Sequence, residues 1–395
     1  MRYAPLTNRL AGLGGAKWEI HALARQMKAA GNPVIELTIG EPDVPCPAEL
    51  IANASAAMQA GRLGYSNGRG EPGLLAALAA RYSERRGRFF GPQNFTTLPG
   101  TQTALYAVLN TLLGPGDEVL IGDPMYATYE GLIASTGARL VPVPLKPKHG
   151  FRMQAADAAP LITQRTRVVL LNSPHNPTGA VLTRDEIAAL GALAVAHDLW
   201  IVSDEVYEEM VFAGTRFVSP LEFPDLAERT VAVASISKSH AAPGFRSGWC
   251  VGPAEFCARI LPLSETILFG SQPFIADMTA AAIAQPSPVA PGMAARFAAR
   301  ADMVHRLLHE RAGLAVHRPE AGMFALLDVR QTGLSGRDFA HALLVERGVA
   351  CMPGESFGAG LAGWLRLSLT TPDDQVAEAC TRIVDFTAKI LGEAA

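Results

Sequence analysis

The stretch SISKSHAAPGFRSGW occupies residues 235–249 and directly follows the apolar run VAVA at residues 231–234. That run is too short for a helix and has enough β-branched residues to indicate a buried parallel strand. In an open α/β sheet, ligands bind in the crevice outside the carboxyl ends of the strands. We therefore expect Lys238 to project into such a crevice, where its amine is a potential nucleophile.

Other side chains of this stretch are suited to hold an anion beside Lys238. Arg246 lies eight residues further on, and its planar guanidinium matches a phosphate or a carboxylate. Ser235 and Ser237 add hydroxyl donors. A phosphate holder next to a reactive lysine is what pyridoxal 5'-phosphate needs, because the lysine forms a Schiff base with the aldehyde while the phosphate anchors the ring. A solvated lysine in a serine-rich turn is the alternative at this point.

Length and composition bound the class of protein. The 395 residues exceed the size at which one hydrophobic core usually keeps growing, so we expect two domains. We place a large cofactor-binding domain at residues 46–285, and an N-terminal arm plus a small domain at residues 1–45 and 286–395. The boundary follows from residues 285–292, where three prolines and a glycine are expected to interrupt both helix and sheet.

Charge and hydropathy exclude several partners. A net charge of -3 without any basic run gives no electrostatic footprint for nucleic acid. We see no leader-like N-terminus and no run of roughly 18 apolar residues, which predicts a cytoplasmic protein without a membrane span. The five cysteines are scattered and form no C-x-x-C pair, so we expect them to be reduced and mostly buried.

Strand-like and helix-like segments alternate through the middle of the chain, which predicts an α/β fold with a largely parallel sheet covered by helices. The predicted strands are residues 118–121, 138–143, 168–171, 200–203 and 231–234. Tyr126, Asn176, Asp204 and Lys238 each follow one of these strands. The carboxyl ends of parallel strands share one edge of the sheet, so we expect these four side chains to converge there.

Further candidates lie outside this series. Thr101 and Gln102 open a helix at Gly100, and a helix start offers free amides and a favourable dipole to a phosphate. Gly40 follows a predicted strand at residues 34–39, which suits a close backbone approach but also a plain turn. Arg366 interrupts an apolar strand-like run, where a cation on an edge strand is the simple alternative.

Two other chemistries are disfavoured. His305 and His309 are four residues apart on a predicted helix, but the H-E-x-x-H order is absent, so we expect no metal. The chain has neither a G-x-G-x-x-G motif after a strand nor a P-loop, which disfavours a Rossmann dehydrogenase and a P-loop enzyme.

Three motifs together resemble the class I aminotransferases, the aspartate aminotransferase-like branch of the fold type I pyridoxal phosphate enzymes. They are NSPHNPTG at residues 172–179, SDEVY at residues 203–207, and the stretch from Ser235 to Arg246. The resemblance extends from GEPD at residues 40–43 to Arg366. It implies a large domain with a mostly parallel sheet flanked by helices and a smaller α+β domain.

The resemblance also implies roles for individual residues. Lys238 is the Schiff-base lysine, Asp204 contacts the pyridine nitrogen, and Tyr207 contacts the ring hydroxyl together with Asn176. Tyr126 stacks on the ring. The phosphate is held by Thr101, Gln102, Ser235, Ser237, Arg246 and, from a second subunit, Tyr65. The substrate is bound by Gly40, Asn176 and Arg366 at its α-carboxylate, with Trp18 nearby.

The function implied is a homodimeric transaminase with shared active sites that moves an amino group from an L-amino acid to a 2-oxo acid in two half-reactions. The start at residues 1–3 and the segments at 125–126, 239–240 and 322–324 are similar to arginine:pyruvate transaminases. Bacterial aspartate aminotransferases often have a lysine where this chain has Gln102, which weakens the case for a dicarboxylic substrate. Aspartate and aromatic donors stay open, as does the acceptor.

Two alternatives use the same cofactor. A cysteine-conjugate β-lyase would release pyruvate without an acceptor. A pyridoxal-phosphate-binding regulator would need a DNA-binding module, for which we expect no room before the N-terminal arm. Trp18, Lys17 and the turn at residues 269–272 are candidates for the specificity wall, but the sequence does not orient them.

Overall fold

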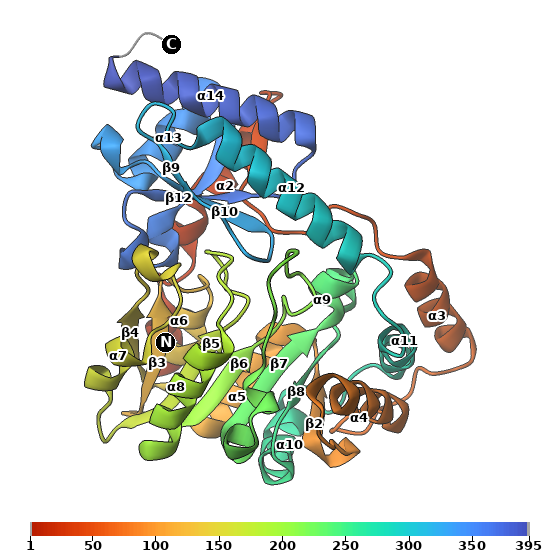
Figure 1. Ribbon diagram of the computed structural model, residues 1–395. Coiled ribbons are helices and arrows are strands. Elements are labelled where there is room, and N and C mark those ends of the chain that lie inside the picture. Colours follow the sequence, from red (N-terminus) through yellow and green to blue (C-terminus); the bar gives the residue numbers. More distant parts are fainter. Residues whose placement is uncertain (1, 393–395) are drawn as a thin grey trace.

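The computed structural model describes residues 2–392 and contains two β-sheets, each covered by helices (Figure 1). Met1 and residues 393–395 lie outside the described residues. Met1 belongs to the start at residues 1–3 that is similar to arginine:pyruvate transaminases. The predicted α/β architecture is confirmed.

The larger sheet has seven strands. In spatial order they are β2 (Phe95–Leu98), β8 (Gly248–Val251), β7 (Thr230–Ser235), β6 (Trp200–Asp204), β5 (Thr166–Asn172), β3 (Glu118–Asp123) and β4 (Arg139–Pro144). The pairs from β7 through β6, β5 and β3 to β4 are parallel, whereas β8 is antiparallel to both β7 and β2. The sheet is therefore mostly parallel, as predicted.

Both faces of this sheet are buried, which explains why its strands are continuously apolar. In β5, Val168 and Leu170 join the core on one face, and Val169 and Leu171 join the core on the other. Helices packed on the two faces or against the sheet edge are α4 (Pro72–Arg86), α5 (Gly100–Leu112), α6 (Tyr129–Thr136), α7 (Ala155–Ala158), α8 (Arg184–Ala196) and α10 (Ala254–Leu268). Helix α11 (Pro273–Ile283) packs on α4, and α3 (Ala48–Gln59) packs on α11.

The smaller sheet has five strands and a core of its own. Its spatial order is β1 (Ile35–Leu37), β11 (Val349–Pro353), β12 (Trp364–Ser368), β10 (Phe324–Asp328) and β9 (Ala315–His317). The helices beside it are α2 (Glu19–Ala29), α12 (Ala290–Leu308), α13 (Gly336–Arg347) and α14 (Asp373–Leu391), which lie above the larger sheet in Figure 1. Leu326, Met352 and Trp364 of the smaller sheet also join the core on one face of the larger sheet. The division into two domains, with boundaries at residues 46 and 285, stays a prediction.

Local signals explain several element ends. The start of α8 has a capping box, in which the Thr183 side chain accepts from the backbone amide of Glu186. The proline-rich run at residues 285–292 was expected to exclude helix throughout, and this was wrong at its end: α12 begins at Ala290. Pro291 fits there because the first helical turn needs no amide donor.

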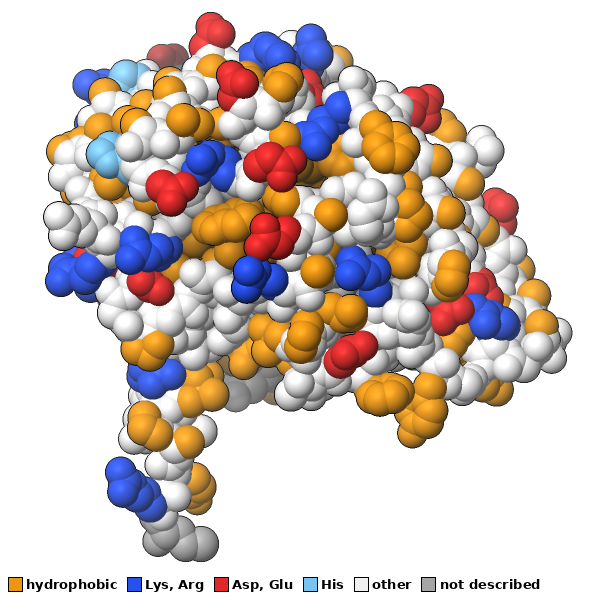
Figure 2. Space-filling view, turned by 90° about the horizontal axis from the view of Figure 1, so that it is seen from below, with side chains coloured by type: hydrophobic (Ala, Val, Ile, Leu, Met, Phe, Trp, Pro, Cys, Tyr) orange, Lys and Arg blue, Asp and Glu red, His pale blue; other side chains and the backbone are white. Residues whose placement is uncertain are grey.

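The chain N-terminus stands apart from both sheets. Helix α1 (Pro5–Leu10) buries none of its residues, and Figure 2 shows this segment projecting from the body of the molecule. Arg9 tethers it, donating from Nε to the carbonyl of Ala134 at 2.9 Å. Among residues 2–392, no helix is both long and apolar enough to cross a bilayer.

Candidate active site

A cavity of about 330 Å³ lies at the carboxyl edge of the larger sheet, where it meets the smaller sheet. Fourteen residues were given roles by the resemblance, and all of them except Tyr65 line the cavity. These thirteen are Trp18, Gly40, Thr101, Gln102, Tyr126, Asn176, Asp204, Tyr207, Ser235, Ser237, Lys238, Arg246 and Arg366. The predicted convergence of strand ends is therefore confirmed. The other candidates for the specificity wall, Lys17 and the turn at residues 269–272, do not line it.

Lys238 reaches the cavity from α9 (Ile236–Ser239), which starts directly after β7. The Ser235 hydroxyl caps this short helix by accepting from the amide of Ser237 at 3.3 Å. Lys238 Nζ donates to the carbonyl of Gly40 at 2.6 Å. Burial lowers the pKa of Lys238 to about 8, so its amine loses a proton more readily than an exposed lysine does.

Gly40 is required by packing rather than by a turn. A side-chain Cβ at this position would lie 2.2 Å from the Phe324 ring. The absence of that atom lets the Gly40 carbonyl approach Lys238 closely. The alternative of a plain turn glycine is therefore excluded.

Asp204 ends β6 and is buried. Its Oδ2 accepts from the Tyr129 hydroxyl at 2.7 Å, and its Oδ1 accepts from the amide of Val206 at 3.2 Å. Desolvation raises the pKa of Asp204 to about 6 in spite of these two donors. A bound cation or N–H donor in the cavity would favour its ionised form.

An anion cradle forms at the start of α5. Gly100 has φ +79°, and a Cβ there would lie 2.4 Å from Nη2 of Arg246. The Thr101 hydroxyl is buried and has no hydrogen-bond partner among the described residues. The Arg246 guanidinium donates to the carbonyls of Pro243 and Pro99, at 3.0 and 3.4 Å. A buried hydroxyl without a partner, a helix start and an arginine together fit a phosphate.

Arg366 is a buried cation on the opposing sheet. Its side chain is 2 % exposed and donates to Asn176 Oδ1 at 3.0 Å and to the Thr38 carbonyl at 2.6 Å. The guanidinium carbon lies 3.8 Å from the Phe324 ring centre and 4.5 Å from that of Phe357. Burial lowers the pKa of Arg366 to about 10, and none of the described carboxylates pairs with it.

The position of Arg366 in the sheet corrects one alternative from the sequence. Strand β12 lies between β11 and β10, so Arg366 is not an edge-strand cation. Its Nε has no hydrogen-bond partner among residues 2–392. A buried guanidinium of this kind is a ready binding site for a carboxylate.

The aromatic and amide groups complete the wall. Tyr126 meets the ring of Tyr129 edge-on, with ring centres 5.5 Å apart at 85°. Burial raises the pKa of both Tyr126 and Tyr207, so both phenols stay neutral. Asn176 is held by its backbone N–H, which donates to Asn172 Oδ1 at 2.9 Å.

Three predicted residues have more peripheral positions. Trp18 lines the cavity, and its ring lies edge-on to His21 at 6.4 Å. Gln102 is exposed and accepts at Oε1 from the Thr128 hydroxyl at 3.0 Å. Tyr65 lies outside the cavity, is 92 % exposed, and packs edge-on against Phe269 at 5.2 Å.

The structure adds lining residues that sequence reasoning missed, chiefly Tyr129, Asn172 and Phe324. Tyr129 begins α6 three residues after Tyr126, and this closeness to a predicted site residue is the signal that could have pointed to it. Asn172 is the last residue of β5 and has the same strand-end signal as Asp204. Nothing in the local sequence marks Phe324, which reaches the cavity from the other sheet.

His305 and His309 give no metal site. Their rings stack with centres 4.4 Å apart, and His309 Nδ1 accepts from the amide of Val316 at 3.1 Å. Within residues 2–392 there is no group of three or more His, Cys, Asp or Glu side chains arranged to hold a metal.

Comparison with known proteins places the chain in a family. The family model "Aminotransferase class I and II" matches residues 32–383. An arginine–pyruvate transaminase of Pseudomonas aeruginosa is 44 % identical over 394 residues, covering 100 % of both chains. An aspartate aminotransferase of Musicola paradisiaca is 32 % identical and covers 94 % of both chains.

Solved structures agree with this match. The aspartate aminotransferase of Rhizobium meliloti superposes with a TM-score of 0.93 at 29 % identity, covering 98 % of this chain and 99 % of its own. The fold type I architecture expected from the resemblance is thereby confirmed. The chain belongs to the class I and II aminotransferase family and is an enzyme that transfers an amino group between an amino acid and a 2-oxo acid.

Proposed function

We propose that this chain binds pyridoxal 5'-phosphate, the cofactor of its family, in the cavity and uses it to transfer the amino group of an L-amino acid to a 2-oxo acid by a ping-pong mechanism. One observation carries the proposal: a desolvated lysine shares this cavity with Arg246 and Arg366, neither of which pairs with a carboxylate of residues 2–392. Arg246 is exposed, but Arg366 is buried and Lys238 is partly buried, and buried positive charge is costly unless an anion joins it.

The residues present fit the cofactor. The unpartnered Thr101 hydroxyl and the amides at the start of α5 suit a phosphate, with Ser235, Ser237 and Arg246 beside them. Gln102 and, from a second subunit, Tyr65 complete the proposed phosphate site. Tyr207 and Asn176 supply donors for the ring hydroxyl, and Tyr126 supplies an aromatic face.

Each side chain then has a chemical task. When bound, the cofactor supplies an electron sink for the negative charge left on the α-carbon after its proton is lost. Asp204, in its ionised form, keeps the pyridine nitrogen protonated. Lys238 acts as general base and then general acid for the α-proton, which its lowered pKa allows near neutral pH.

Arg366 fixes the geometry of the substrate. Its guanidinium can hold the α-carboxylate through two parallel charge-assisted hydrogen bonds, with Asn176 and Gly40 alongside. Holding the carboxylate fixes which bond of the α-carbon is presented to Lys238. The arrangement favours removal of the proton over loss of the carboxylate.

For the substrates we propose arginine as donor and pyruvate as acceptor, with Trp18 on the side-chain wall. The full-length relative from Pseudomonas aeruginosa supports this pair. The charged residues that line the cavity are Asp204, Lys238, Arg246 and Arg366, and all four already have tasks. Gln102 is neutral, so this subunit offers no further cation for the distal carboxylate of aspartate.

We propose a homodimer with shared active sites. The exposed Tyr65 supports it, and so does the segment around α1 that projects from the molecule in Figure 2, because both offer apolar side chains to a second copy. In that dimer Tyr65 donates to the phosphate in the partner's cavity. The cytoplasmic location expected from the sequence stays a prediction.

The test is a screen of amino donors with pyruvate and with 2-oxoglutarate, using protein loaded with the cofactor. We expect arginine with pyruvate to give the highest kcat/KM, and aspartate with 2-oxoglutarate to be poor. Lys238→Ala should abolish turnover while leaving the fold intact. Failure of every donor would refute transamination by this chain, and pyruvate release without an acceptor would point to the β-lyase.

A further inference from the structure

Tyr129 is the residue of the cavity wall that contacts Asp204 most directly. It is the first residue of α6, its side chain is 1 % exposed, and its hydroxyl donates to Asp204 Oδ2 at 2.7 Å. Burial raises the pKa of Tyr129 well above its usual range. The phenol therefore stays protonated and acts toward Asp204 as a donor.

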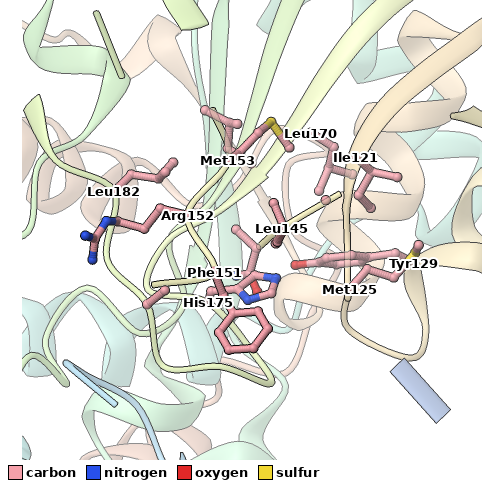
Figure 3. A pocket seen from close by; sticks show the side chains of 14 residues that line it. Ile121, Met125, Tyr129, Leu145, Phe151, Arg152, Met153, Leu170, His175 and Leu182 are labelled. Atoms are coloured by element: carbon pink, nitrogen blue, oxygen red, sulfur yellow. The ribbon is translucent and has the colours of Figure 1, made fainter. Parts of the chain in front are cut away.

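The surroundings of Tyr129 hold its ring in place. Tyr129 also lines a small cavity of about 30 Å³, together with largely apolar side chains that include Met125, Leu145 and Phe151. Figure 3 shows the Tyr129 ring beside Met125, with its hydroxyl directed toward the middle of this group. The nearby His175 is neutral, because burial lowers its pKa to about 3. Among the described residues of this lining, Arg152 is the one charged side chain, and it pairs with Glu186 and Glu320 rather than with Asp204.

We infer that Tyr129 is a positioning residue: its hydroxyl keeps the Asp204 carboxylate ionised and directed at the nitrogen of the bound cofactor ring. The inference rests on the proposed function. Asp204 is buried and has two donors, the Tyr129 hydroxyl and the amide of Val206. Without the hydroxyl, Oδ2 loses its donor and burial favours the neutral carboxyl, which cannot pair with a protonated pyridine nitrogen.

The other titratable side chains around Asp204 do not replace this donor. Tyr126, Tyr207, Lys238 and Arg366 line the same cavity. None of them forms a hydrogen bond with the Asp204 carboxylate within the described chain, whereas Tyr129 does. The two tyrosines are neutral, and the two cations have other partners, the carbonyl of Gly40 and the pair of Asn176 and Thr38.

The test uses Tyr129→Phe, which keeps the ring and removes only the hydroxyl. The first measurement is the pyridine nitrogen chemical shift of ¹⁵N-labelled pyridoxal phosphate bound to the protein. The second is the protonation midpoint of Asp204 in the cofactor-free protein, from ¹³C-carboxyl NMR assigned with Asp204→Asn. Tyr106→Phe is the control, since Tyr106 is a partly buried tyrosine of α5 that does not line the cavity.

We expect Tyr129→Phe to raise the Asp204 midpoint by about one pH unit, which is about tenfold in proton affinity or about 1.4 kcal/mol. The bound nitrogen should shift toward the unprotonated value, and the control should match the wild type. A Tyr129→Phe protein with wild-type nitrogen shift and midpoint would overturn the inference. A wild-type protein that binds no cofactor, or binds it with an unprotonated nitrogen, would instead refute the proposed function.

Discussion

Replacing Arg366 by methionine separates its proposed task from any role in the fold. The guanidinium is buried, forms no ion pair with a described residue, and donates to Asn176 and Thr38. A hydrogen bond to a charged group contributes about 1.5–3 kcal/mol. Two such bonds to a substrate carboxylate amount to about 3–6 kcal/mol, so kcat/KM should fall by about 10²–10⁴-fold.

The stability of the cofactor-free protein should change much less. Removing Arg366 leaves two acceptors without a donor, at a cost of about 1–3 kcal/mol each. It also removes a buried charge that has no counter-ion, whose desolvation costs several kcal/mol. These opposing terms nearly cancel, so we expect the free energy of unfolding to stay within about 2 kcal/mol of the wild type.

The assay combines steady-state kinetics with urea unfolding of the cofactor-free protein. Arg330→Met is the matched control, because this arginine belongs to the same half of the molecule, is 59 % exposed and pairs with Asp328. We expect the control to leave both kcat/KM and stability nearly unchanged. If Arg366→Met kept kcat/KM within threefold of the wild type, the carboxylate assignment would be wrong. If it lost more than about 4 kcal/mol of stability, Arg366 would be structural instead.

Three further predictions concern other parts of the molecule. Arg86→Met should destabilise the protein by about 3–5 kcal/mol in urea unfolding, because Arg86 is buried and donates to the fully buried Glu205 at 3.0 Å. The control Arg259→Gln removes an exposed ion pair and should lower the free energy of unfolding by less than about 0.5 kcal/mol. The pKa of Asp204 is raised from 3.8 to about 6 in the folded protein, so proton binding should stabilise the cofactor-free protein by about 3 kcal/mol below pH 4. This stabilisation should be lost as the pH rises through 6. If unfolding of an Asp204→Asn protein showed the same pH dependence, the assignment to Asp204 would be wrong. Gln102→Lys should raise kcat/KM for aspartate about two- to fivefold by adding a partly exposed cation near the cavity, and no gain would place the substrate side chain elsewhere.

Much of the site was predictable because it rests on strand ends. Asp204 and Lys238 directly follow apolar runs, and parallel strands bring their carboxyl ends to one edge. The same logic located Asn176 and Tyr126. Continuous burial of residues 168–171 in β5 shows why these runs indicate strands: both faces are covered, so the signal is a short continuous apolar segment.

The rest depended on contacts between distant parts of the chain. Arg366 is buried because β12 is an inner strand of its sheet and because the guanidinium lies against the rings of Phe324 and Phe357. The local run of residues 364–369 is equally compatible with an edge strand. The hydrogen bond from Tyr129 to Asp204 joins residues 75 positions apart, so neither local spacing nor composition could reveal it.

The start of α12 was missed for a different reason. Prolines such as those near residue 290 usually predict that a helix is interrupted. At the first turn of a helix a proline costs nothing, because that turn has no acceptor for its amide. The sequence alone does not show which of the two contexts applies.

The central claim is that one lysine of the chain binds the cofactor covalently. The chain has five other lysines, at positions 17, 28, 146, 148 and 389, and among the described residues only Lys238 lines the cavity. The direct measurement is borohydride reduction of the protein with bound pyridoxal phosphate, followed by peptide mass spectrometry. We predict a single modified peptide containing Lys238. Stable modification of a different lysine, or a protein that binds no cofactor, would contradict the account.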